Sequence, residues 1–323
     1  MPNLNIAWWN LENLFNHEKA VRDSELKSKL KSELKGWSAK VRDKKVSQLA
    51  HIIELMFNGN GPDLLGVCEV ENEIVMERLA NAINMPGRNY AVVSHASDDA
   101  RGIDTSFLLD TDQLSVVSTH HQVVIKRSAT RDIFWVRLRV NATGAEFVAV
   151  ANHWPARSAG QYASEPFRIL AGETHAYIIS GMLDKERGGE KTLPIISMGD
   201  YNDEPFNRSC QEYMLGSRDP GRVRYSRSGH MLNLMWPLMH GHDPGTYLFG
   251  SNWNMLDQFL VSYGMLRTAS QVRANINSVE IFKPDILKAS GGKPRKFSRP
   301  SAKKGVDLDG YSDHFPITVE LKV

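Results

Sequence analysis

Several short apolar segments of the chain end abruptly at a polar residue of a chemically reactive type. IAWW is followed by Asn10, LLGVC by Glu69, FVAVAN by His153 and PIISMG by Asp200. Short apolar runs bounded by polar turn formers are typical of buried β-strands. One polar residue at a strand end is usually a turn former. Several of them, on strands that can share one rim, predict a functional site at that rim.

Two further predicted strands carry polar residues of the same kind. MLDQFLVS contains Asp257, and GYSDHFPITVE places Asp313 and His314 before a terminal strand. In that strand Ile317 and Val319 alternate with polar residues, which is the period of a half-buried strand. Closing a sheet requires neither a carboxylate nor an imidazole, so this adjacent pair is a candidate for chemistry.

The other segments predict strands and helices that interleave without a regular βαβ rhythm. This favours mixed sheets over a TIM barrel or a Rossmann sheet. Helices are predicted over 40–57, 73–83 and 164–183, the last with a Ser cap and Pro166 near its first turn, and 24–35 is predicted as an exposed helix or a mobile insertion. We predict one domain over 1–323. The predicted strands, in addition to LLGVC and the terminal strand, cover 4–9, 90–93, 103–109, 134–140, 146–151, 194–198, 255–262 and 279–282.

Bulk composition restricts the class of protein more than its function. The chain has 323 residues, 41% hydrophobic and 24% charged, which is typical of a globular protein in solution. No apolar stretch approaches the ~18 residues of a membrane-spanning helix, and LNIAWWN predicts a strand where a signal peptide would stand. Two cysteines permit a reducing compartment. We therefore expect a cytoplasmic protein, or a secreted or periplasmic one if a signal peptide has been removed.

The net charge of +2 is small, but basic residues gather in one segment. Between Lys283 and Lys304 there is a single acid, Asp285. The segment lies between two predicted strands, so it is expected to be a loop within the domain. A solvated loop is one interpretation, and a contact with a phosphate backbone is the other. The basic residues are Lys283, Lys288, Lys293, Arg295, Lys296, Arg299, Lys303 and Lys304.

The residue types at the predicted rim favour metal-assisted hydrolysis. Glu69 and Asp313, helped by Asn10, supply hard oxygen ligands, which suit Mg²⁺ or Mn²⁺ better than Zn²⁺. Histidines beside carboxylates suit acid–base chemistry near neutral pH. The chain has neither a GxSxG elbow nor a plausible cysteine nucleophile. Attack on phosphorus by water that a metal activates is therefore the expected reaction.

The motifs, in their order, resemble the endonuclease/exonuclease/phosphatase superfamily, which has the deoxyribonuclease-I-like fold. They are WWNLENLF, GVCEVEN, RGIDTSFLL, ANHWPAR, SMGDYNDEP, NMLDQFLVS and YSDHFPI, and they extend over essentially the whole chain. The resemblance implies an α+β fold: a four-layer α/β/β/α sandwich of two mixed, mostly antiparallel β-sheets flanked by helices. It also places the active site at one rim of the sheets.

The resemblance assigns expected roles to the residues that match these motifs. Asn10, Glu69 and Asp313 are similar to the family's metal-site residues. Asp200 and Asn202 resemble the pair that positions the attacking water and contacts the phosphate.

Two histidines complete the set that the resemblance implies. His314 resembles the catalytic imidazole, oriented by Asp257. His153 resembles a second histidine of the deoxyribonuclease and phosphatase branches, and Asp104 is a plausible partner for it.

Some of these positions have simpler explanations. Asn10 could cap the turn after the first strand, and Asp104 could bond only to backbone nearby. Arg157 and Arg168 follow His153 in NHWPARSAGQYASEPFR and are expected as secondary phosphate contacts, although both could face solvent.

The predicted activity is that of a Mg²⁺-dependent endonuclease that cleaves DNA or RNA by in-line attack of water. His153 distinguishes the chain from the abasic-site repair branch, which lacks a histidine there. NMLDQFL stands where the inositol polyphosphate 5-phosphatases carry a PAWCDR-like motif. A sphingomyelinase-like or other small phosphodiesterase or phosphatase is the first alternative, and an inactive nucleic-acid-binding member is the second. The basic segment favours nucleic acid. No protein partner can be read from the sequence.

Overall fold

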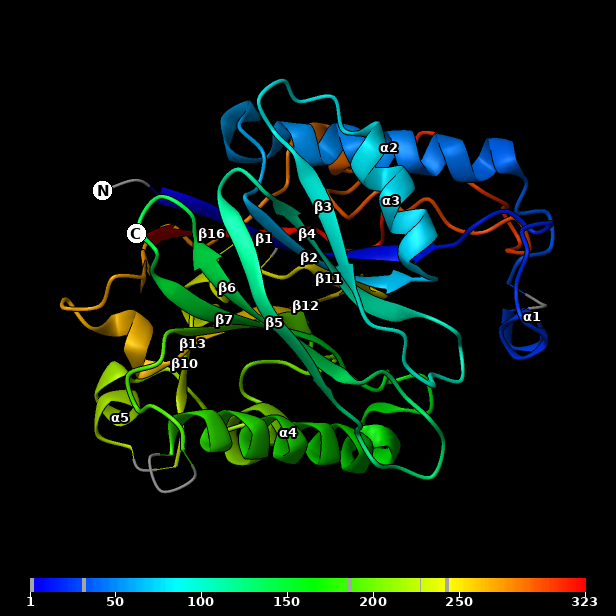
Figure 1. Cartoon of the computed structure of the whole chain (residues 1–323). Helices are drawn as coiled ribbons and strands as arrows, with labels where there is room; N and C mark the ends of the chain where they lie inside the picture. Colours follow the sequence, from blue (N-terminus) through cyan, green and yellow to red (C-terminus); the bar gives the residue numbers. More distant parts are fainter. Residues whose placement is uncertain (1–2, 31–32, 185–187, 227, 242–243) are drawn as a thin grey trace.

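The computed structural model shows two β-sheets stacked face to face, with helices covering both outer faces (Figure 1). The elements form the four layers expected from the sequence, with α2 and α3 outside one sheet and α4 outside the other. No described helix is long and apolar enough to span a membrane. The structure describes residues 3–30, 33–184, 188–226, 228–241 and 244–323.

The first sheet brings the two ends of the chain together. Its strand order is β14-β16-β1-β2-β4-β3, with β15 also paired to β16. β1 and β2 run parallel, while β16, β4 and β3 pair antiparallel with their neighbours. The strands are β1 (Asn3–Leu14), β2 (Leu64–Val70), β3 (Tyr90–Ser94), β4 (Asp104–Asp110), β14 (Arg273–Ala274), β15 (Glu280–Ile281) and β16 (Ile317–Lys322).

The second sheet has the order β5-β6-β7-β8-β13-β10-β9. β7 and β8 are parallel, as are β9 and β10, and the other neighbours are antiparallel. A separate hairpin of β11 (Tyr247–Phe249) and β12 (Asn252–Asn254) lies beside it. The strands are β5 (Leu114–Gln122), β6 (Ile133–Val140), β7 (Glu146–His153), β8 (Ile195–Asp200), β9 (Gly216–Ser217), β10 (Met231–Asn233) and β13 (Asp257–Val261).

Two predicted helices are confirmed and a third begins earlier than expected. α2 starts after its cap Ser38, whose hydroxyl accepts from the Val41 amide, and α3 is capped by Asn72. Ser164 was predicted to cap the third helix. Its amide already bonds to the Gly160 carbonyl, so the first turn closes before Ser164 and Pro166 lies inside the helix. The helices are α1 (Ser24–Leu30), α2 (Ala39–Gly59), α3 (Glu73–Ala82), α4 (Gln161–Leu183) and α5 (Pro220–Tyr225).

The alternation of side chains in β1 builds two apolar layers at once. Trp8 points between the two sheets, and Trp9 points to the layer under α2 and α3. Both indoles are fully buried, which stabilises the fold by on the order of 3 kcal/mol each. A third layer lies between the second sheet and α4. These layers fix the spacing between the two sheets, and therefore the spacing of side chains that reach across it.

Two segments differ from expectation. β5 was not predicted, because it is an edge strand whose side chains are mostly polar and exposed. The 24–35 segment was expected to be exposed or mobile, but Leu30 and Leu34 are buried against Trp37 and Phe297. Its residues 31 and 32 lie outside the described part of the chain. The described part of this segment therefore covers a small apolar cluster.

Candidate active site

Three predicted site residues lie in one row across the second sheet. His153 at the end of β7 is in register with Asp200 at the end of β8, and Asp200 is in register with Asp257 at the start of β13. β7 and β8 are parallel and β13 is antiparallel to them, so all three positions fall at the same rim. All three side chains are buried. Strand register therefore places an imidazole and two carboxylates side by side.

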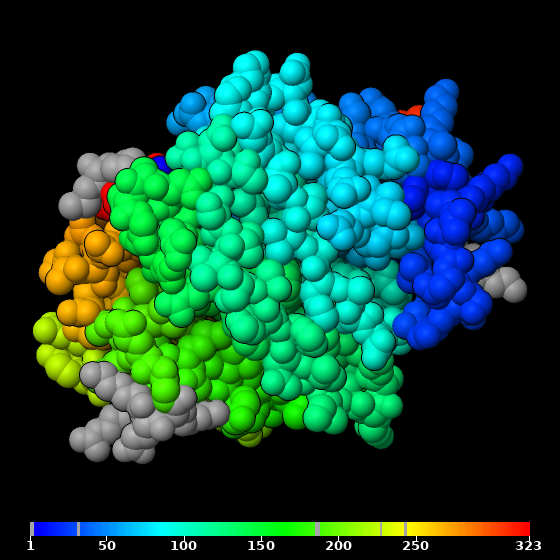
Figure 2. Space-filling model, viewed as in Figure 1, coloured from blue at the N-terminus to red at the C-terminus, as the bar shows by residue number. Residues whose placement is uncertain are grey.

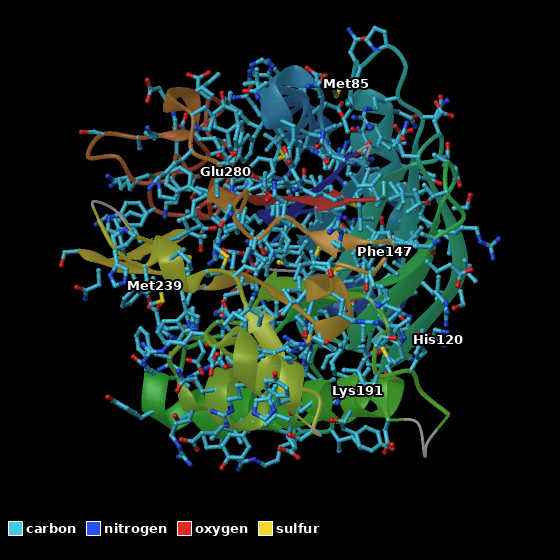
Figure 3. All side chains as sticks on the ribbon, turned by 90° about the vertical axis from the view of Figure 1, so that its left-hand side faces the viewer. Met85, His120, Phe147, Lys191, Met239 and Glu280 are labelled. Atoms are coloured by element: carbon cyan, nitrogen blue, oxygen red, sulfur yellow. The ribbon has the colours of Figure 1, made fainter. Side chains whose placement is uncertain are left out.

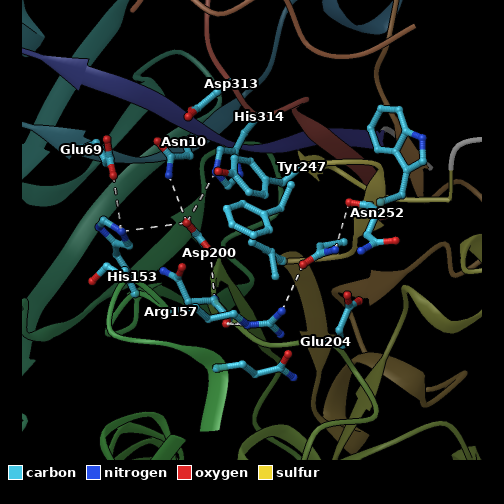
Figure 4. Close-up of a pocket in the computed structure, with 18 of the residues that line it drawn as sticks. Asn10, Glu69, His153, Arg157, Asp200, Glu204, Tyr247, Asn252, Asp313 and His314 are labelled. Atoms are coloured by element: carbon cyan, nitrogen blue, oxygen red, sulfur yellow. Dashed lines mark hydrogen bonds and ion pairs between the residues drawn. The ribbon is translucent and has the colours of Figure 1, made fainter. Parts of the chain in front are cut away.

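The first sheet supplies the opposing residues through an irregularity in its strands. The pairing of β2 with β4 shifts register at Glu69, whose φ of 62° is unusual for a residue with a side chain. This bulge turns the Glu69 carboxylate toward a pocket that His153 and Asp200 also line, which is called the catalytic pocket below because the predicted site residues lie in it. Asn10 near the end of β1, and Asp313 and His314 before β16, line the same pocket (Figure 4).

Direct hydrogen bonds connect the two sheets at this rim. Asn10 Nδ2 donates to Asp200 Oδ2 at 3.1 Å, and His314 Nδ1 lies 2.7 Å from Asp257 Oδ2. Trp8 Nε1 donates to the other Asp257 oxygen at 2.9 Å. Both Asp257 oxygens are occupied, so this carboxylate is well placed to orient His314 and poorly placed to hold a metal.

His314 is surrounded by carboxylates that favour its protonated form. Burial opposes the charge, but Asp257, then Asp200 and Asp313, outweigh it and raise the pKa of His314 to about 10. The phenol ring of Tyr247 stacks on the imidazole, with centroids 4.7 Å apart. The Nε2 atom of His314 lies 3.9 Å from Asp200 Oδ2, which is too far for a direct hydrogen bond.

His153 has the opposite electrostatic environment. Burial, followed by the positive charges of Arg131 and Arg101, holds its pKa well below the ordinary value. Its Nε2 lies 3.8 Å from Glu69 Oε1 and 3.9 Å from Asp200 Oδ2. The two histidines therefore flank Asp200 at equal distances, one favouring the charged state and the other the neutral state.

The expected pairing of Asp104 with His153 is not present. Asp104 Oδ1 accepts hydrogen bonds from the amide and hydroxyl of Ser97, and the buried Nδ1 of His153 has no partner among the described residues. The local alternative for Asp104 is the one observed, because Ser97 lies closer in the folded loop. Burial raises the pKa of Asp104 to about 6.

The side chains predicted to hold a metal fit a hard divalent cation. Glu69 and Asp313 line one pocket with the amide of Asn10. Burial raises the pKa of Asp313, and the nearby Glu69 charge raises it further. Among the described residues none donates a hydrogen bond to the Asp313 carboxylate. Crowded carboxylates of this kind are stabilised by a cation such as Mg²⁺ or Mn²⁺. Burial also raises the pKa of Asp200 to about 6.

Asn202 is held rigidly beside Asp200. Its amide N–H donates to Asp200 Oδ1 at 2.9 Å, and its Nδ2 donates to the Trp154 carbonyl. Its φ of 51° is left-handed, a conformation that asparagine tolerates better than most residues. The side chain lines the pocket next to Asp200. The turn after β8 thus orients both residues of the predicted phosphate-contacting pair.

The two arginines predicted as phosphate contacts have structural roles instead. Arg168 has no exposed surface, and its Nε lies 2.8 Å from Asp203 Oδ2. Arg157 lines the pocket, but its nitrogens donate to Asn202 O, Asp203 Oδ1, Asn207 Oδ1 and Asn254 Oδ1. The prediction for Arg168 is wrong, because the buried Asp203 requires a counter-charge. Arg157 supports the pocket wall with donors that are already engaged.

The rim opens into a pocket of about 820 Å³. Opposite the acidic side, its wall carries aromatic rings: Phe206 and Phe249 are 52% and 70% exposed, and Trp253 stacks on Phe315 with centroids 6.0 Å apart. The exposed rings offer flat apolar surfaces at the pocket lip. Phe206, Phe249 and Tyr247 were not predicted as site residues, because single aromatic residues in loops or short strands form no recognisable pattern.

Several charged residues near the site were also missed. Arg131 donates to the carbonyls of His153 and Trp154 and to Asp99, and Arg101 lies 3.4 Å from Glu69. Arg101 is the first residue of the RGIDTSFLL motif, so the motif could have identified it as a residue near the site. Arg131 lies in a loop with no such signal.

The basic segment lines a second hollow of about 440 Å³ that continues from the catalytic pocket. Tyr247 and Asp313 border both. Arg295 is paired with Asp307 and Asp309, and Arg299 with Glu33, so these charges are partly neutralised. The lysines that line the hollow are Lys293, Lys296 and Lys304.

Comparisons with known proteins identify related folds. The sequence profile of the Endonuclease/Exonuclease/phosphatase family matches residues 5–323. No curated protein matches the chain. Similar solved structures include an endonuclease/exonuclease/phosphatase from Bacteroides vulgatus, with 17% identity, a TM-score of 0.58, and 100% of both chains covered.

Two further solved structures have titles that state an activity or a bound product. A mannosyl-6-phosphatase from Bacteroides thetaiotaomicron has 17% identity and a TM-score of 0.57, and 99% of this chain and 100% of that chain are covered. TDP2 from D. rerio, complexed with a single strand DNA product, has 12% identity and a TM-score of 0.57, with 99% of both chains covered. At these identities the likeness shows the fold.

Proposed function

Because the chain belongs to the Endonuclease/Exonuclease/phosphatase family, a family of phosphoesterases, we propose that it is a divalent-metal-dependent phosphodiesterase acting on nucleic acid. The observation that carries this proposal is the arrangement around Asp200. Two imidazole nitrogens lie 3.9 Å from the same carboxylate oxygen, on either side of it. Such gaps are too long for direct hydrogen bonds, yet one oxygen atom of a water or a phosphate can bridge each.

Asn10, Glu69 and Asp313 would hold the cation, with Mg²⁺ or Mn²⁺ as the suitable ions. When bound, the cation neutralises negative charge that develops on the phosphoryl oxygens. The side chains of the chain itself account for orientation and proton transfer. The Asn202 side chain is available to the phosphate from a fixed turn beside Asp200.

In the proposed reaction Asp200 accepts a proton from the attacking water as the new phosphorus–oxygen bond forms. The bond to the leaving oxygen breaks on the opposite side of the phosphorus. His314, held by Asp257, is charged in the metal-free protein and can give a proton to that oxygen. His153 stays neutral and bonds to the phosphate through Nε2.

The surroundings of the pocket support a polymeric substrate. Lys293, Lys296 and Lys304 extend the site along one direction, where the backbone of a longer substrate can follow. Phe206 and Phe249 at the pocket lip offer surfaces for stacking of bases. A small phosphorylated substrate would leave the lysine-lined hollow unused.

Conversion of supercoiled plasmid to nicked circles tests the proposal directly. We expect nicking with Mg²⁺, none with EDTA, and a loss of about 10²–10⁴-fold in the variant D200N. The exposed His51 on α2 supplies a matched control, H51A, which should retain full activity. Absence of metal-dependent nicking and of RNA cleavage would contradict the nucleic-acid assignment.

A phosphatase acting on sugar phosphates is the second candidate, because the mannosyl-6-phosphatase shares the fold over the whole chain. Mannose 6-phosphate and sphingomyelin belong in the same assay. Release of phosphate or phosphocholine without nicking would transfer the proposal to a small substrate. Binding of DNA that is unaffected by H314A, with no turnover of any substrate, would support an inactive binding protein.

A further inference from the structure

A second group of metal-ligating side chains lies at the edge of the sandwich. His95 follows β3, an edge strand of the first sheet, and His121 lies on β5, an edge strand of the second. Asp132 directly precedes β6. Figure 2 shows the face on which the segments around β3 and β5 meet as one continuous surface. The group therefore connects the two sheets at a place where backbone pairing does not.

The three side chains are already in contact with one another. His95 Nε2 lies 2.8 Å from Asp132 Oδ2, and the rings of His95 and His121 stack with centroids 3.9 Å apart. One ligand atom from each residue falls within 4.8 Å of the other two. The ring of Phe134 also stacks on His95, with centroids 5.7 Å apart. Asp132 is buried, whereas His121 is exposed.

We propose that His95, His121 and Asp132 bind a transition-metal ion of the Zn²⁺ class that fastens β3 to β5. Two imidazoles and one carboxylate form a donor set that suits zinc. Bonds of about 2.0–2.1 Å require the exposed His121 ring to leave its stack on His95, so that one nitrogen of each ring points to the same ion. The three side chains leave a coordination position of the ion open toward solvent, where a water molecule can bind. This site is separate from the oxygen-rich catalytic pocket, which suits Mg²⁺.

The site has a route by which it affects the catalytic pocket. The loop that begins at His95 contains Asp99, which pairs with Arg131, and Arg101, which contacts Glu69. Arg131 is adjacent to Asp132 and donates to the His153 carbonyl. A metal ion bound to His95, His121 and Asp132 would fix the start of this loop and both ends of the 123–132 loop, and so restrain the residues that support Glu69 and His153. Metal binding at the sheet edge should therefore stabilise the fold.

Zinc titration of the purified full chain in excess Mg²⁺ tests the proposal. We expect a zinc ion bound per chain by equilibrium dialysis and elemental analysis, together with a higher midpoint of thermal unfolding. The variant H121F keeps a ring to stack on His95 but lacks the nitrogen ligand. It should lose zinc affinity by more than about tenfold and show no zinc-dependent rise in the midpoint.

Two controls separate this site from other binding. The neighbouring His120, which Figure 3 labels at the side of the molecule, is exposed and stacks on Trp135, so H120F should bind zinc like the wild type. A double variant E69Q/D313N removes the oxygen ligands of the catalytic pocket and should still take up zinc at the sheet edge. Equal zinc uptake by H121F and wild type, or uptake abolished only in E69Q/D313N, would overturn the proposal.

Discussion

The two histidines of the site show how position alone gives one residue type two protonation states. At His314 the charges of three carboxylates outweigh burial and raise the pKa, whereas at His153 burial, followed by the charges of Arg131 and Arg101, lowers it. Pairs of titratable groups separated in this way mark acid and base roles in active sites. Sequence motifs identified both histidines. They could not reveal the protonation states, because Arg101 and Arg131 reach His153 only through the folded loops.

The first prediction at this scale concerns the orienting carboxylate. The variant D257N keeps the shape of the side chain but removes the charge that favours protonated His314. We expect kcat for the hydrolysed substrate to fall by about 10²–10⁴-fold, with a smaller change in KM. The alkaline limb of the pH profile should move to lower pH, because the pKa of His314 falls when the Asp257 charge is removed. An unchanged pH profile would show that Asp257 only supports packing.

A second prediction tests the corrected role of Arg168. Replacement by methionine removes one of the two arginines that pair with buried Asp203 and leaves only Arg157, and we expect the free energy of unfolding to fall by about 3 kcal/mol. The exposed pair of Arg139 with Glu146 offers a comparison, and R139M should change stability far less. Denaturant titration measures both. Unaltered stability of R168M with a higher KM would restore the phosphate contact that the sequence predicted.

At the scale of elements, the polar ends of buried strands could be predicted from the sequence, but the edge strand β5 could not. The buried strands that carry Asn10, Glu69, His153 and Asp200 have continuous apolar sequences, so both their type and their polar ends could be identified. β5 could not be, since an edge strand facing solvent carries polar residues without a clear period. The start of α4 was misplaced because Ser164 bonds backward to Gly160 from within the helix.

The contact of α4 with the second sheet predicts a dependence of stability on pH. His175 on α4 is fully buried, and burial lowers its pKa from 6.5 to about 3. Between these values the unfolded chain binds the extra proton, so stability falls as the pH drops through this window. The slope from this one group is at most about 1.4 kcal/mol per pH unit.

The variant H175Q can still bond to Ser197 but does not titrate. Its stability relative to wild type should therefore rise as the pH is lowered from 6.5 toward 3, whatever its value at neutral pH. Urea unfolding at several pH values measures the difference. H51Q, at an exposed position on α2, should follow the wild-type curve. Parallel acid limbs for H175Q and wild type would contradict the prediction.

At the scale of the whole molecule, the basic segment becomes a more specific feature than its composition suggested. Arginines that looked available are paired with acids distant in sequence, such as Glu33. Charge counting along the chain could not show this, because the partners meet only after folding. The basic side chains of the segment that still offer charge to a ligand are the lysines that line the hollow next to the catalytic pocket.

Neutralising this hollow should weaken binding to nucleic acid in a salt-dependent way. For the triple variant K293Q/K296Q/K304Q we expect the slope of log K against log salt to decrease by about 0.9 for each lost phosphate contact. Fluorescence anisotropy with a labelled oligonucleotide provides the measurement. K191Q, an exposed lysine beyond the end of α4, should keep the original slope. The same slope in the triple variant would return the segment to a solvated surface role.

The order in which the chain is synthesised gives the division of the site between the two sheets a biological consequence. His153, Asp200 and Asp257 emerge from the ribosome well before Asp313 and His314, which belong to the strand that closes the first sheet. A nascent polypeptide that stops short of position 313 lacks both the imidazole proposed to donate a proton and one of the proposed cation ligands. Unfinished or truncated translation products should be inert, so a cell that makes this hydrolase is not exposed to its activity until the polypeptide extends past that pair.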